Sequence, residues 1–506
     1  MKTGDRPHFP EDRKWGLSPV FPFFFAFLAG AATVLAYSPF DLLPVGVLAF
    51  ALLVHLWVGA GSPRAAFLLG FWFGLGLFGA GVSWVYVSLH QFGGMPAPLA
   101  VVATLGFCAV LALYPALAGW LQARVAASDF VRATLVIPAA WIFTEWLRGW
   151  FLTGFPWLAL GYASAGWPYA GFAPVLGVYG VSLAIAALSG CAWCFVRGPG
   201  RGAALAALLL VSAVGEALRH VAWTTPSGTV GASLLQGNIP QQMKFSPELY
   251  ARTLDTYARL AGESRAPLVI LPETAVPRLL DQVEPDFLRR LEDIARRNRG
   301  DLLLGAPVRT SPRVYFNAVV SLGTSPRQIY RKVHLVPFGE FAPPGFGWVM
   351  RTLSIPLADF SRGEASQRPL AVAGARVAAN VCYEDAYGED IARQLPEADL
   401  LVNVSNVAWF GDSLAPAQHL QIARLRALET GRAYLTATNT GITAAIDRDG
   451  RVIAQLPQFT EGRLDVTAPR YSGATPYVRY GDLGALGACA LLLAIALVFT
   501  PRAPSG

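Results

Sequence analysis

The sequence predicts a bundle of eight membrane-spanning helices with one α/β domain inserted before the last span. Of the 506 residues, 54% are hydrophobic and only 14% are charged, whereas an average soluble protein carries about 25% charged residues. Apolar stretches long enough to cross a bilayer, about 20 residues each, recur through the first part of the chain and once near its end. The interval 222–481 contains no such stretch and holds most of the acidic residues.

Seven predicted spans precede the inserted domain and one follows it. They lie at 18–37, 42–60, 66–88, 98–122, 132–151, 170–195, 203–221 and 482–500. The sequence therefore divides into an N-terminal transmembrane bundle, an inserted domain, and a C-terminal span with a short tail. Their bounds are 1–221, 222–481 and 482–506.

The distribution of basic residues predicts how the chain is oriented. The loops "SPFDLLP" and "HQFGGMPAP" carry no Lys or Arg, whereas the alternate loops and both ends do. Because short cytoplasmic loops are enriched in Lys and Arg, we expect both termini in the cytoplasm and residues 222–481 in the periplasm of a bacterium, with the chain in its inner membrane. The basic start followed by an apolar run imitates a signal peptide, but further spans follow it, so we expect a retained anchor.

Short apolar runs alternate with amphipathic segments in the inserted domain, which indicates an α/β domain with strands buried between helical layers. We expect buried strands at 232–236, 267–272, 301–307, 377–381 and 400–405. We expect helices at 246–262, 284–300 and 415–432. Residues 434–453 have the pattern of a hairpin that turns at "DRDG".

One cysteine, Cys382, lies in the inserted domain. It ends the apolar run "VAANV" and is followed by a tyrosine and two acids. The other cysteines fall in predicted spans, where we expect them to pack: Cys108, Cys191, Cys194 and Cys489. A lone thiol in an oxidising compartment is a free reactive group.

Three polar residues follow predicted apolar runs at comparable places. Glu273 follows "LVILP", Lys332 follows "QIYR" and Cys382 follows "VAANV". In layered α/β folds ligands bind beyond the carboxyl ends of the strands, so we expect the three to meet in one cleft. There Glu273 could take the thiol proton, and Lys332 could stabilise a thiolate and then an oxyanion. A Cys–His arrangement with His334 or His419 as the base is an open alternative.

Three motifs resemble, in order and spacing, those of the nitrilase (carbon–nitrogen hydrolase) superfamily. They are "LPETAVP" (271–277), "YRKVHLVPFGEF" (330–341) and "NVCYED" (380–385). In this membrane frame nearly the whole chain is similar to the apolipoprotein N-acyltransferase family, as are "SNVAWFGDSLAPAQHLQIARLRALETGR" (405–432) and "TNTGITA" (438–444). The resemblance implies an α-β-β-α sandwich with a catalytic triad of Glu273, Lys332 and Cys382.

The resemblance also implies a two-step reaction. Cys382 takes an acyl chain from a phospholipid, typically phosphatidylethanolamine, as a thioester, and the α-amine of an apolipoprotein's diacylglyceryl-cysteine then takes the chain from the enzyme. Glu273 deprotonates first the thiol and then the incoming ammonium. This thiol chemistry needs no cofactor, and we expect a monomer in membrane lipid.

Four further residues match family positions. Glu340, in "PFGEF", matches an acid that is expected to orient Lys332. Tyr383 and Glu384 match positions after the nucleophile; the other interpretation is structural, a Tyr packed beneath the turn and a Glu that ties a loop. Trp409 matches an aromatic that lines the substrate entrance, although it also suits an ordinary core, and the family often has Asp where this chain has Val407.

Two other segments carry predictions. Residues 338–360 are apolar, rich in Pro and Gly and poor in charge, so they form either a lid that dips into the lipid surface or a loop packed on the domain. Glu145 and Arg148 stand at helical i,i+3 spacing within a span, where charges usually pair and face the bundle interior.

Two other function classes compete with acyl transfer. A membrane-tethered amidase or nitrilase would use the same triad with water as the acceptor. A scaffold or transporter would use the inserted domain only for binding, but the spans lack the broken-helix pair typical of transporters. The six His are scattered without ligand spacing, so no metal site is expected, and no basic groove for nucleic acid is apparent.

Overall fold

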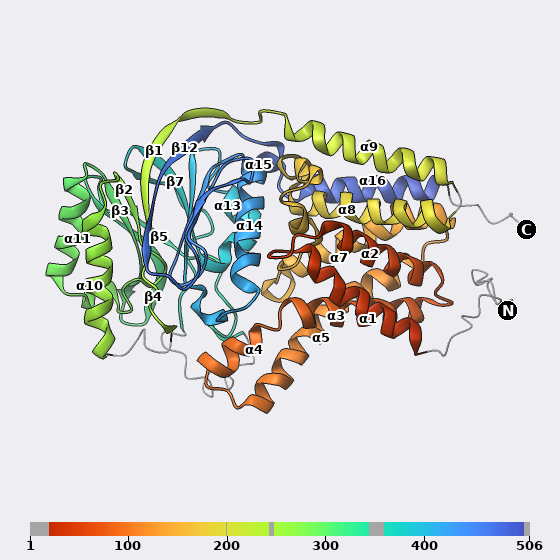
Figure 1. Ribbon diagram of the computed structural model, residues 1–506, viewed down its shortest axis with the longest axis horizontal. Coiled ribbons are helices and arrows are strands. Elements are labelled where there is room, and N and C mark those ends of the chain that lie inside the picture. The colour runs from red at the N-terminus through yellow and green to blue at the C-terminus, as the bar shows by residue number, and fades with distance from the viewer. Residues whose placement is uncertain (1–19, 199, 242–246, 344–358, 500–506) are drawn as a thin grey trace, which may run out of the picture. The chain divides into compact units, whose positions relative to one another are not determined.

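The computed structural model of the protein describes residues 20–198, 200–241, 247–343 and 359–499. The chain divides into two compact units. Of the described residues, unit one holds 20–83, 101–220 and 482–499, and unit two holds 84–100 and 221–481. Figure 1 shows the helices of unit one and the sheets of unit two.

Unit one is helical. Its helices are α1 (Phe21–Thr33), α2 (Leu43–Val58), α3 (Pro63–Gly81), α5 (Ala97–Gln122, which begins in unit two), α6 (Asp129–Val131), α7 (Ile137–Trp150), α8 (Ala173–Arg197), α9 (Arg201–Arg219) and α16 (Leu483–Val498). Close packing of α1 against α3 needs glycine. Small residues let apolar helices approach closely. The backbones are so close here that a Cβ on Gly30 would clash with the carbonyl of Phe73, and a Cβ on Gly76 would clash with the carbonyl of Phe27.

Five helical stretches among the described residues are long and apolar enough to cross a membrane. They are Pro63–Gly81, Ala97–Gln122, Asp129–Thr153, Pro168–Arg197 and Arg201–Arg219. Shorter apolar helices stand where the other three spans were predicted: Phe21–Ala36, Leu43–Val58 and Leu483–Val498. By length and composition, then, the structure supports five of the eight predicted spans.

Glu145 and Arg148 of α7 form the predicted pair. Both side chains are buried, and Arg148 Nη2 lies 3.9 Å from Glu145 Oε1. Glu145 Oε1 also accepts the backbone N–H of Leu160 at 2.9 Å, and Arg148 donates to the carbonyls of Phe155 and Trp157. The pair therefore fastens the chain that follows α7 to α7 itself.

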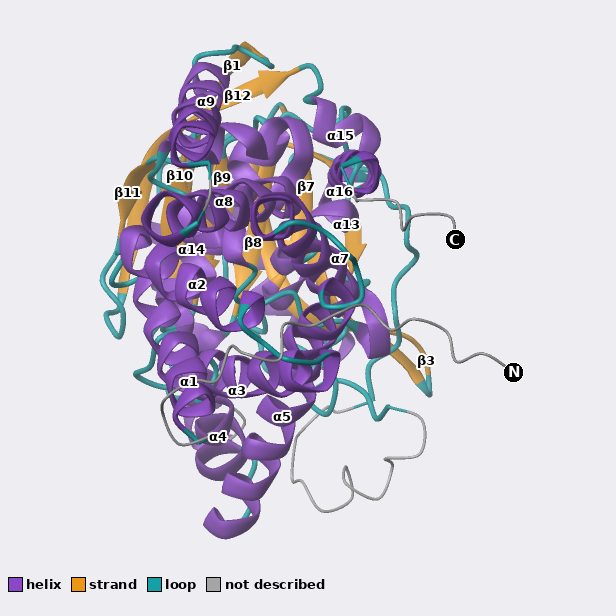
Figure 2. Ribbon diagram, turned by 90° about the vertical axis from the view of Figure 1, so that its right-hand side faces the viewer, coloured by secondary structure: helices purple, strands orange, loops and turns teal. Residues whose placement is uncertain are grey.

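Unit two is built on two six-stranded sheets, whose strand orders are β12-β1-β2-β3-β4-β5 and β11-β10-β9-β8-β7-β6. The first sheet contains β1 (Thr225–Gln236), β2 (Leu268–Ile270), β3 (Asp301–Ser311), β4 (Val314–Gly323), β5 (Ile329–Arg331) and β12 (Gly462–Ser472). The second contains β6 (Leu370–Val372), β7 (Ala375–Val381), β8 (Leu400–Ser405), β9 (Tyr434–Thr438), β10 (Ala444–Ile446) and β11 (Val452–Gln455). In Figure 2, β11, β10, β9, β8 and β7 follow one another across this second sheet.

The described α-helices of unit two are α4 (Val85–Val87), α10 (Pro247–Glu263), α11 (Pro285–Arg297), α13 (Gly388–Ala392), α14 (Ala415–Thr430) and α15 (Pro476–Tyr480). Of these, α10 and α11 cover the outer face of the first sheet, and α13 and α14 cover that of the second. Strand residues alternate between two cores. Leu268 and Ile270 lie in a core shared by both sheets, whereas Val269 packs with α10 and α11. Ala379 likewise lies in the shared core, and Ala378 packs with α13 and α14. The layers are therefore α-β-β-α, as the nitrilase-like resemblance implies.

Strand direction places the site. β1, β2 and β3 are parallel, and so are β7, β8 and β9. β5 runs with β3, because both pair antiparallel with β4. The chain therefore leaves β2, β5 and β7 toward Glu273, Lys332 and Cys382 at the carboxyl ends of strands in the two facing sheets.

The predicted hairpin over 434–453 consists of three strands instead of two. β9 pairs antiparallel with β10, and β10 with β11, so the "DRDG" turn joins β10 to β11. The loop between β9 and β10 begins at Asn439, whose side chain accepts the N–H of Ile239 at 2.9 Å and donates to its carbonyl at 2.8 Å. These two bonds to a distant loop explain why the first strand ends early.

The predicted third span, 66–88, is too long, because α3 ends at Gly81 and residues 84–100 belong to unit two. There Trp84 Nε1 donates to Gln418 Oε1 of α14 at 3.2 Å. Ser88 Oγ donates to the carbonyl of Trp409 at 2.7 Å. The polar groups of this segment thus find their partners in the inserted domain.

Candidate active site

One ammonium lies between two carboxylates at the carboxyl ends of the strands. Lys332 Nζ is 2.9 Å from Glu340 Oε2 and 3.6 Å from Glu273 Oε1. Lys332 is 1% exposed, Glu273 7% and Glu340 8%, so water screens these charges little. The structure brings together three residues that the sequence singled out from separate motifs.

Cys382 lies directly after β7 on a tight turn, the 3-10 helix η9 (Cys382–Ala386). Its φ of 54° is unusual for a residue with a side chain. Asn403 of β8 holds this turn, because its Nδ2 donates to the carbonyl of Cys382 at 3.0 Å and to Asn380 Oδ1 at 2.6 Å. The backbone of a buried cysteine is thus fixed by the neighbouring strand.

Burial and charge set the protonation of the cluster. Burial and Glu273 raise the pKa of Cys382 well above its ordinary value, although Lys332 lowers it, so the resting sulfur is a thiol that needs a base. Burial lowers the pKa of Lys332, but Glu340 and Glu273 outweigh burial and raise it above its ordinary value. The amine is therefore an ammonium at neutral pH.

Asn317 is a site residue that the sequence reasoning missed. It lies in β4, 3% exposed, and its Nδ2 donates to Glu273 Oε1 and to Glu340 Oε1, both at 2.7 Å. Its carbonyl accepts the N–H of Lys332 at 2.8 Å. One amide therefore bridges the two carboxylates and fixes the start of the Lys332 loop. The signal in the sequence is a lone polar residue inside the apolar run "VYFNAVV".

The second oxygen of Glu273 is held by the loop after β8. The backbone N–H of Asn406 donates to Glu273 Oε2 at 2.8 Å.

Trp409 lies in the next turn of that loop, η10 (Val407–Phe410). It is half-buried, and the centroid of its ring is 6.1 Å from that of Phe92. The described contacts of Trp409 thus join the Glu273-bearing side of the site to residues 84–100. Val407, in the same turn, is buried.

Glu384 ties the lysine loop to the nucleophile strand. Its carboxylate accepts the backbone N–H groups of Val333 at 2.6 Å, His334 at 3.0 Å and Val381 at 2.7 Å, and the hydroxyl of Tyr330 at 3.0 Å. Burial raises the pKa of Glu384 to about 7, against the lowering effects of Lys332 and these N–H groups. These contacts match the structural interpretation of Glu384.

The remaining sequence candidates lie around the turn. Tyr383 is half-buried, and its hydroxyl accepts that of Tyr387 at 2.8 Å. His334 stacks on Tyr387 with ring centroids 3.4 Å apart, and its Nδ1 lies 3.4 Å from Asp390. His419 Nε2 is 3.0 Å from Asp385 Oδ2 and 3.5 Å from the carbonyl oxygen of Cys382. Both histidines thus have carboxylate partners of their own.

Two predictions reach the limits of the described chain. Most of the lid segment proposed over 338–360 lies outside the described residues, because 344–358 are not among them. Within the described ranges, no group of three or more His, Cys, Asp or Glu side chains is arranged to hold a metal ion.

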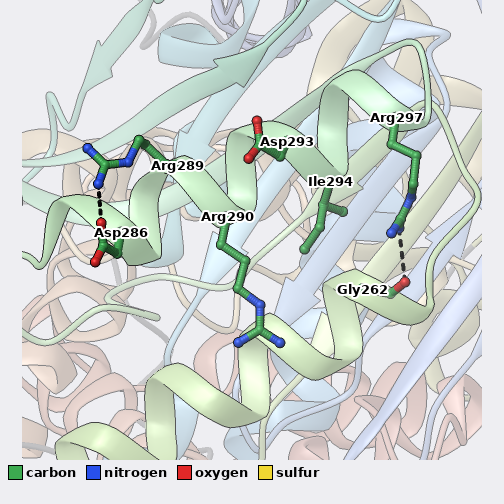
Figure 3. A pocket seen from close by; sticks show the side chains of 7 residues that line it. All are labelled: Gly262, Asp286, Arg289, Arg290, Asp293, Ile294 and Arg297. Atoms are coloured by element: carbon green, nitrogen blue, oxygen red, sulfur yellow. Dashed lines mark hydrogen bonds and ion pairs between the residues drawn. The ribbon is translucent and has the colours of Figure 1, made fainter.

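A cavity of about 540 Å³ lies elsewhere in unit two, between α10 and α11 (Figure 3). Arg289 pairs there with Asp286, and Arg297 donates to the carbonyl of Gly262 at 2.9 Å. Its seven lining residues include no thiol or hydroxyl nucleophile. It is a surface hollow between two helices, apart from the strand ends that carry Glu273, Lys332 and Cys382.

Comparison with known proteins places the chain in a family. The model of the apolipoprotein N-acyltransferase N-terminal domain matches residues 29–192, and that of carbon–nitrogen hydrolases matches 231–476. Apolipoprotein N-acyltransferase of Nitrosomonas europaea is 50% identical over 92% of this chain and 95% of its own length. The apolipoprotein N-acyltransferase of Methylococcus capsulatus is 46% identical over 93% of this chain and 94% of its own length. The C. elegans NitFhit structure has 16% identity and a TM-score of 0.39, and the match covers 55% of this chain and 66% of that one. The chain therefore belongs to the apolipoprotein N-acyltransferase family of bacterial membrane proteins and is an acyltransferase.

Proposed function

We propose that the protein moves an acyl chain from a phospholipid, with phosphatidylethanolamine as the expected donor, to the α-amino group of an apolipoprotein's N-terminal diacylglyceryl-cysteine. Cys382 carries the chain as a thioester between the two steps. The observation that supports this most is the buried Lys332 ammonium between Glu273 and Glu340 beside the Cys382 turn. Membership of the N-acyltransferase family supports the acceptor.

In the first step Cys382 Sγ attacks an ester carbonyl of the phospholipid while Glu273 takes the thiol proton. Lys332 stabilises the oxyanion of the tetrahedral intermediate. The C–O bond then breaks, Glu273 returns the proton to the departing oxygen, and the lysophospholipid leaves. Because the sulfur rests as a thiol, the base has to act in concert with the attack.

In the second step the α-amine attacks the thioester carbonyl. Glu273 takes a proton from the amine, the C–S bond breaks, and Cys382 leaves as a thiolate that is reprotonated. A thioester is a better acceptor for an amine than an ester is, so dividing the transfer lowers each barrier. Glu340 and Asn317 keep Lys332 and Glu273 in place through both steps.

We propose for the membrane frame eight spans, with residues 1–221 as the transmembrane bundle, 222–481 as a periplasmic catalytic domain and 482–506 as the last span and a cytoplasmic tail. The asymmetry of Lys and Arg among the loops supports this orientation. A single cysteine placed at Arg448, in the "DRDG" turn, should react with a membrane-impermeant maleimide in intact spheroplasts. Reaction only after lysis would place the domain in the cytoplasm.

The purified protein is then incubated with phosphatidylethanolamine that carries a labelled acyl chain. We expect label on the protein that hydroxylamine removes, release of lysophospholipid, and transfer to a diacylated lipopeptide. The matched control is Cys382→Ala, which should carry no label. Label that persists in Cys382→Ala would refute the nucleophile. Release of the chain to water with no acylated peptide would instead indicate a membrane-tethered hydrolase.

A further inference from the structure

A second ionic pair lies under the nucleophile turn, on the side of its backbone. His419 of α14 and Asp385 of η9 are 3.0 Å apart, and their side chains are 5% and 0% exposed. A buried pair costs desolvation free energy that its attraction often fails to repay. A gain in stability therefore does not by itself explain why this pair lies beside Cys382.

The pair contacts the nucleophile residue directly. His419 Nε2 lies 3.5 Å from the carbonyl oxygen of Cys382, which also accepts Asn403 Nδ2 at 3.0 Å. Asp385 stands three residues after Cys382 in the same turn. A change in the charge of either partner therefore acts on the turn that aims the sulfur.

Charge around the sulfur is unbalanced without His419. Burial first, then Glu273, Glu340 and Asp385 raise the pKa of Cys382, and Lys332 lowers it. Lys332 already faces Glu273 and Glu340. An uncompensated Asp385 would add a third carboxylate to the field of a thiolate that one ammonium has to stabilise.

The groups that face the pair favour the charged form of His419. Burial lowers the pKa of His419, but Asp385 outweighs burial and raises it above its ordinary value; the carbonyl of Cys382 and Glu273 act in the same direction. Asp385 also acts on Cys382 and on the hydroxyl of Tyr434, on β9, which donates to Asn380 Oδ1 at 2.9 Å. The 3.0 Å contact and the raised pKa of His419 together favour an imidazolium beside Asp385.

We propose that His419 is a positioning residue whose positive charge neutralises Asp385 beneath the Cys382 turn, so that Lys332 stabilises the developing thiolate without the opposing field of Asp385. This inference rests on the proposed function of Cys382 as the nucleophile. It assigns His419 to the backbone side of the turn, a different task from that of a general base.

The test measures carbamidomethylation of Cys382 by iodoacetamide in the full-length protein in detergent, followed at the Cys382 peptide by mass spectrometry between pH 6 and 10. His419→Gln keeps an amide N–H and loses the charge. We expect its rate at pH 7.5 to fall about tenfold, the equivalent of one pKa unit, and its profile to move to higher pH. Arg426→Gln is the matched control, because it removes a buried charge on α14 that pairs with Glu429 at 2.9 Å; it should leave the profile in place.

The double variant His419→Gln/Asp385→Asn gives the sharpest outcome, because removing both charges should restore the rate to within about threefold of the wild type. Asp385→Asn alone should also stay close to the wild type, since His419 becomes neutral once its partner is gone. If Cys382 in the double variant, or in Asp385→Asn alone, reacted as slowly as in His419→Gln, the proposal would be overturned. The pair would then act only by packing beneath the turn. If His419→Gln does not fold, Asp385→Asn alone decides between the two.

Alkylation needs neither lipid nor apolipoprotein, so the two proposals fail separately. If wild-type Cys382 is never acylated by phospholipid while the alkylation pattern holds, the proposed function is wrong and the charge balance stands. If acylation proceeds and His419→Gln alkylates at the wild-type rate, the charge balance alone is wrong.

Discussion

Both units bury ionic groups, and they use them differently. In unit one, Arg148 and Glu145 form one pair. Arg148 also donates to the carbonyls of Phe155 and Trp157, and Glu145 accepts the N–H of Leu160 and the indole N–H of Trp141. In unit two, the single Lys332 ammonium serves two carboxylates, and the amide of Asn317 bridges them.

The difference shows where chemistry can happen. The Arg148–Glu145 pair is balanced in charge, and its further bonds hold two segments together. In unit two the pKa values of Cys382 and Lys332 are both raised above their ordinary values, and such perturbed groups gather at functional sites. Substitutions in the two clusters should therefore differ in kind: loss of chemistry in unit two and loss of stability in unit one.

Lys332→Met should have the largest effect on rate. Methionine keeps most of the side-chain volume and removes the oxyanion donor, a loss that costs about 10²–10³-fold in other enzymes. We expect acyl-enzyme formation from labelled phospholipid to slow by about that factor per folded molecule; the rate is measured on the folded fraction, because Glu273 and Glu340 lose their buried partner. An acyl-enzyme that forms at the wild-type rate would remove Lys332 from the mechanism.

Asn317→Asp should come next. The substitution keeps the shape, but it replaces the N–H donor to Glu273 and Glu340 with a third carboxylate. The added carboxylate repels the developing thiolate of Cys382 as well as Glu273, so we expect a loss of about 10–100-fold, the equivalent of one to two pKa units of the thiol. The acidic limb of the pH–rate profile should move to higher pH. Asn317→Leu, which lacks the donor but adds no charge, should lose less; equal losses would mean that the donor alone matters.

Glu340→Gln should cost about tenfold in acyl-enzyme formation, the equivalent of one pKa unit. Glu340 raises the pKa of Lys332 against the lowering effect of burial, so its loss lowers that pKa. Glu340 also holds the ammonium at 2.9 Å, so the variant should orient the oxyanion donor less well. A Glu340→Gln protein that forms the acyl-enzyme at the wild-type rate would separate Glu340 from the function of Lys332.

Arg148→Met should leave the chemistry nearly unchanged. Removing one partner of a buried pair costs about 3–5 kcal/mol of stability, so we expect a lower thermal unfolding midpoint in detergent. The rate per folded molecule should stay within about twofold, because sites that share no partners act independently. A large rate loss in folded protein would erase the contrast between the two clusters.

Sequence reasoning succeeded where one pattern had one physical cause. The run 400–405 lacks charged residues because β8 is buried on both faces, and its predicted bounds match Leu400–Ser405. The positions of Glu273, Lys332 and Cys382 just after strands were predicted from the apolar runs that precede them. β12 was missed, because its solvent-facing positions carry charged residues such as Asp465 and its pattern is broken by Pro469.

Contacts between distant segments were beyond the sequence. Nothing local marks Asn317 as a partner of both Glu273 and Glu340, because those bonds depend on how β4 pairs with β5. His419 was considered only as a base, since its partner Asp385 becomes a neighbour only when α14 covers the turn. Local patterns predict the elements, whereas tertiary packing decides which polar groups meet.

The most direct measurement is the mass of the Cys382 peptide after the full-length protein has been exposed to phosphatidylethanolamine. We expect a gain in mass equal to one fatty acyl chain, absent in Cys382→Ala and lost again when a diacylated lipopeptide is added. An unmodified Cys382 peptide in a preparation that still acylates the lipopeptide would exclude Cys382 as the carrier of the acyl chain.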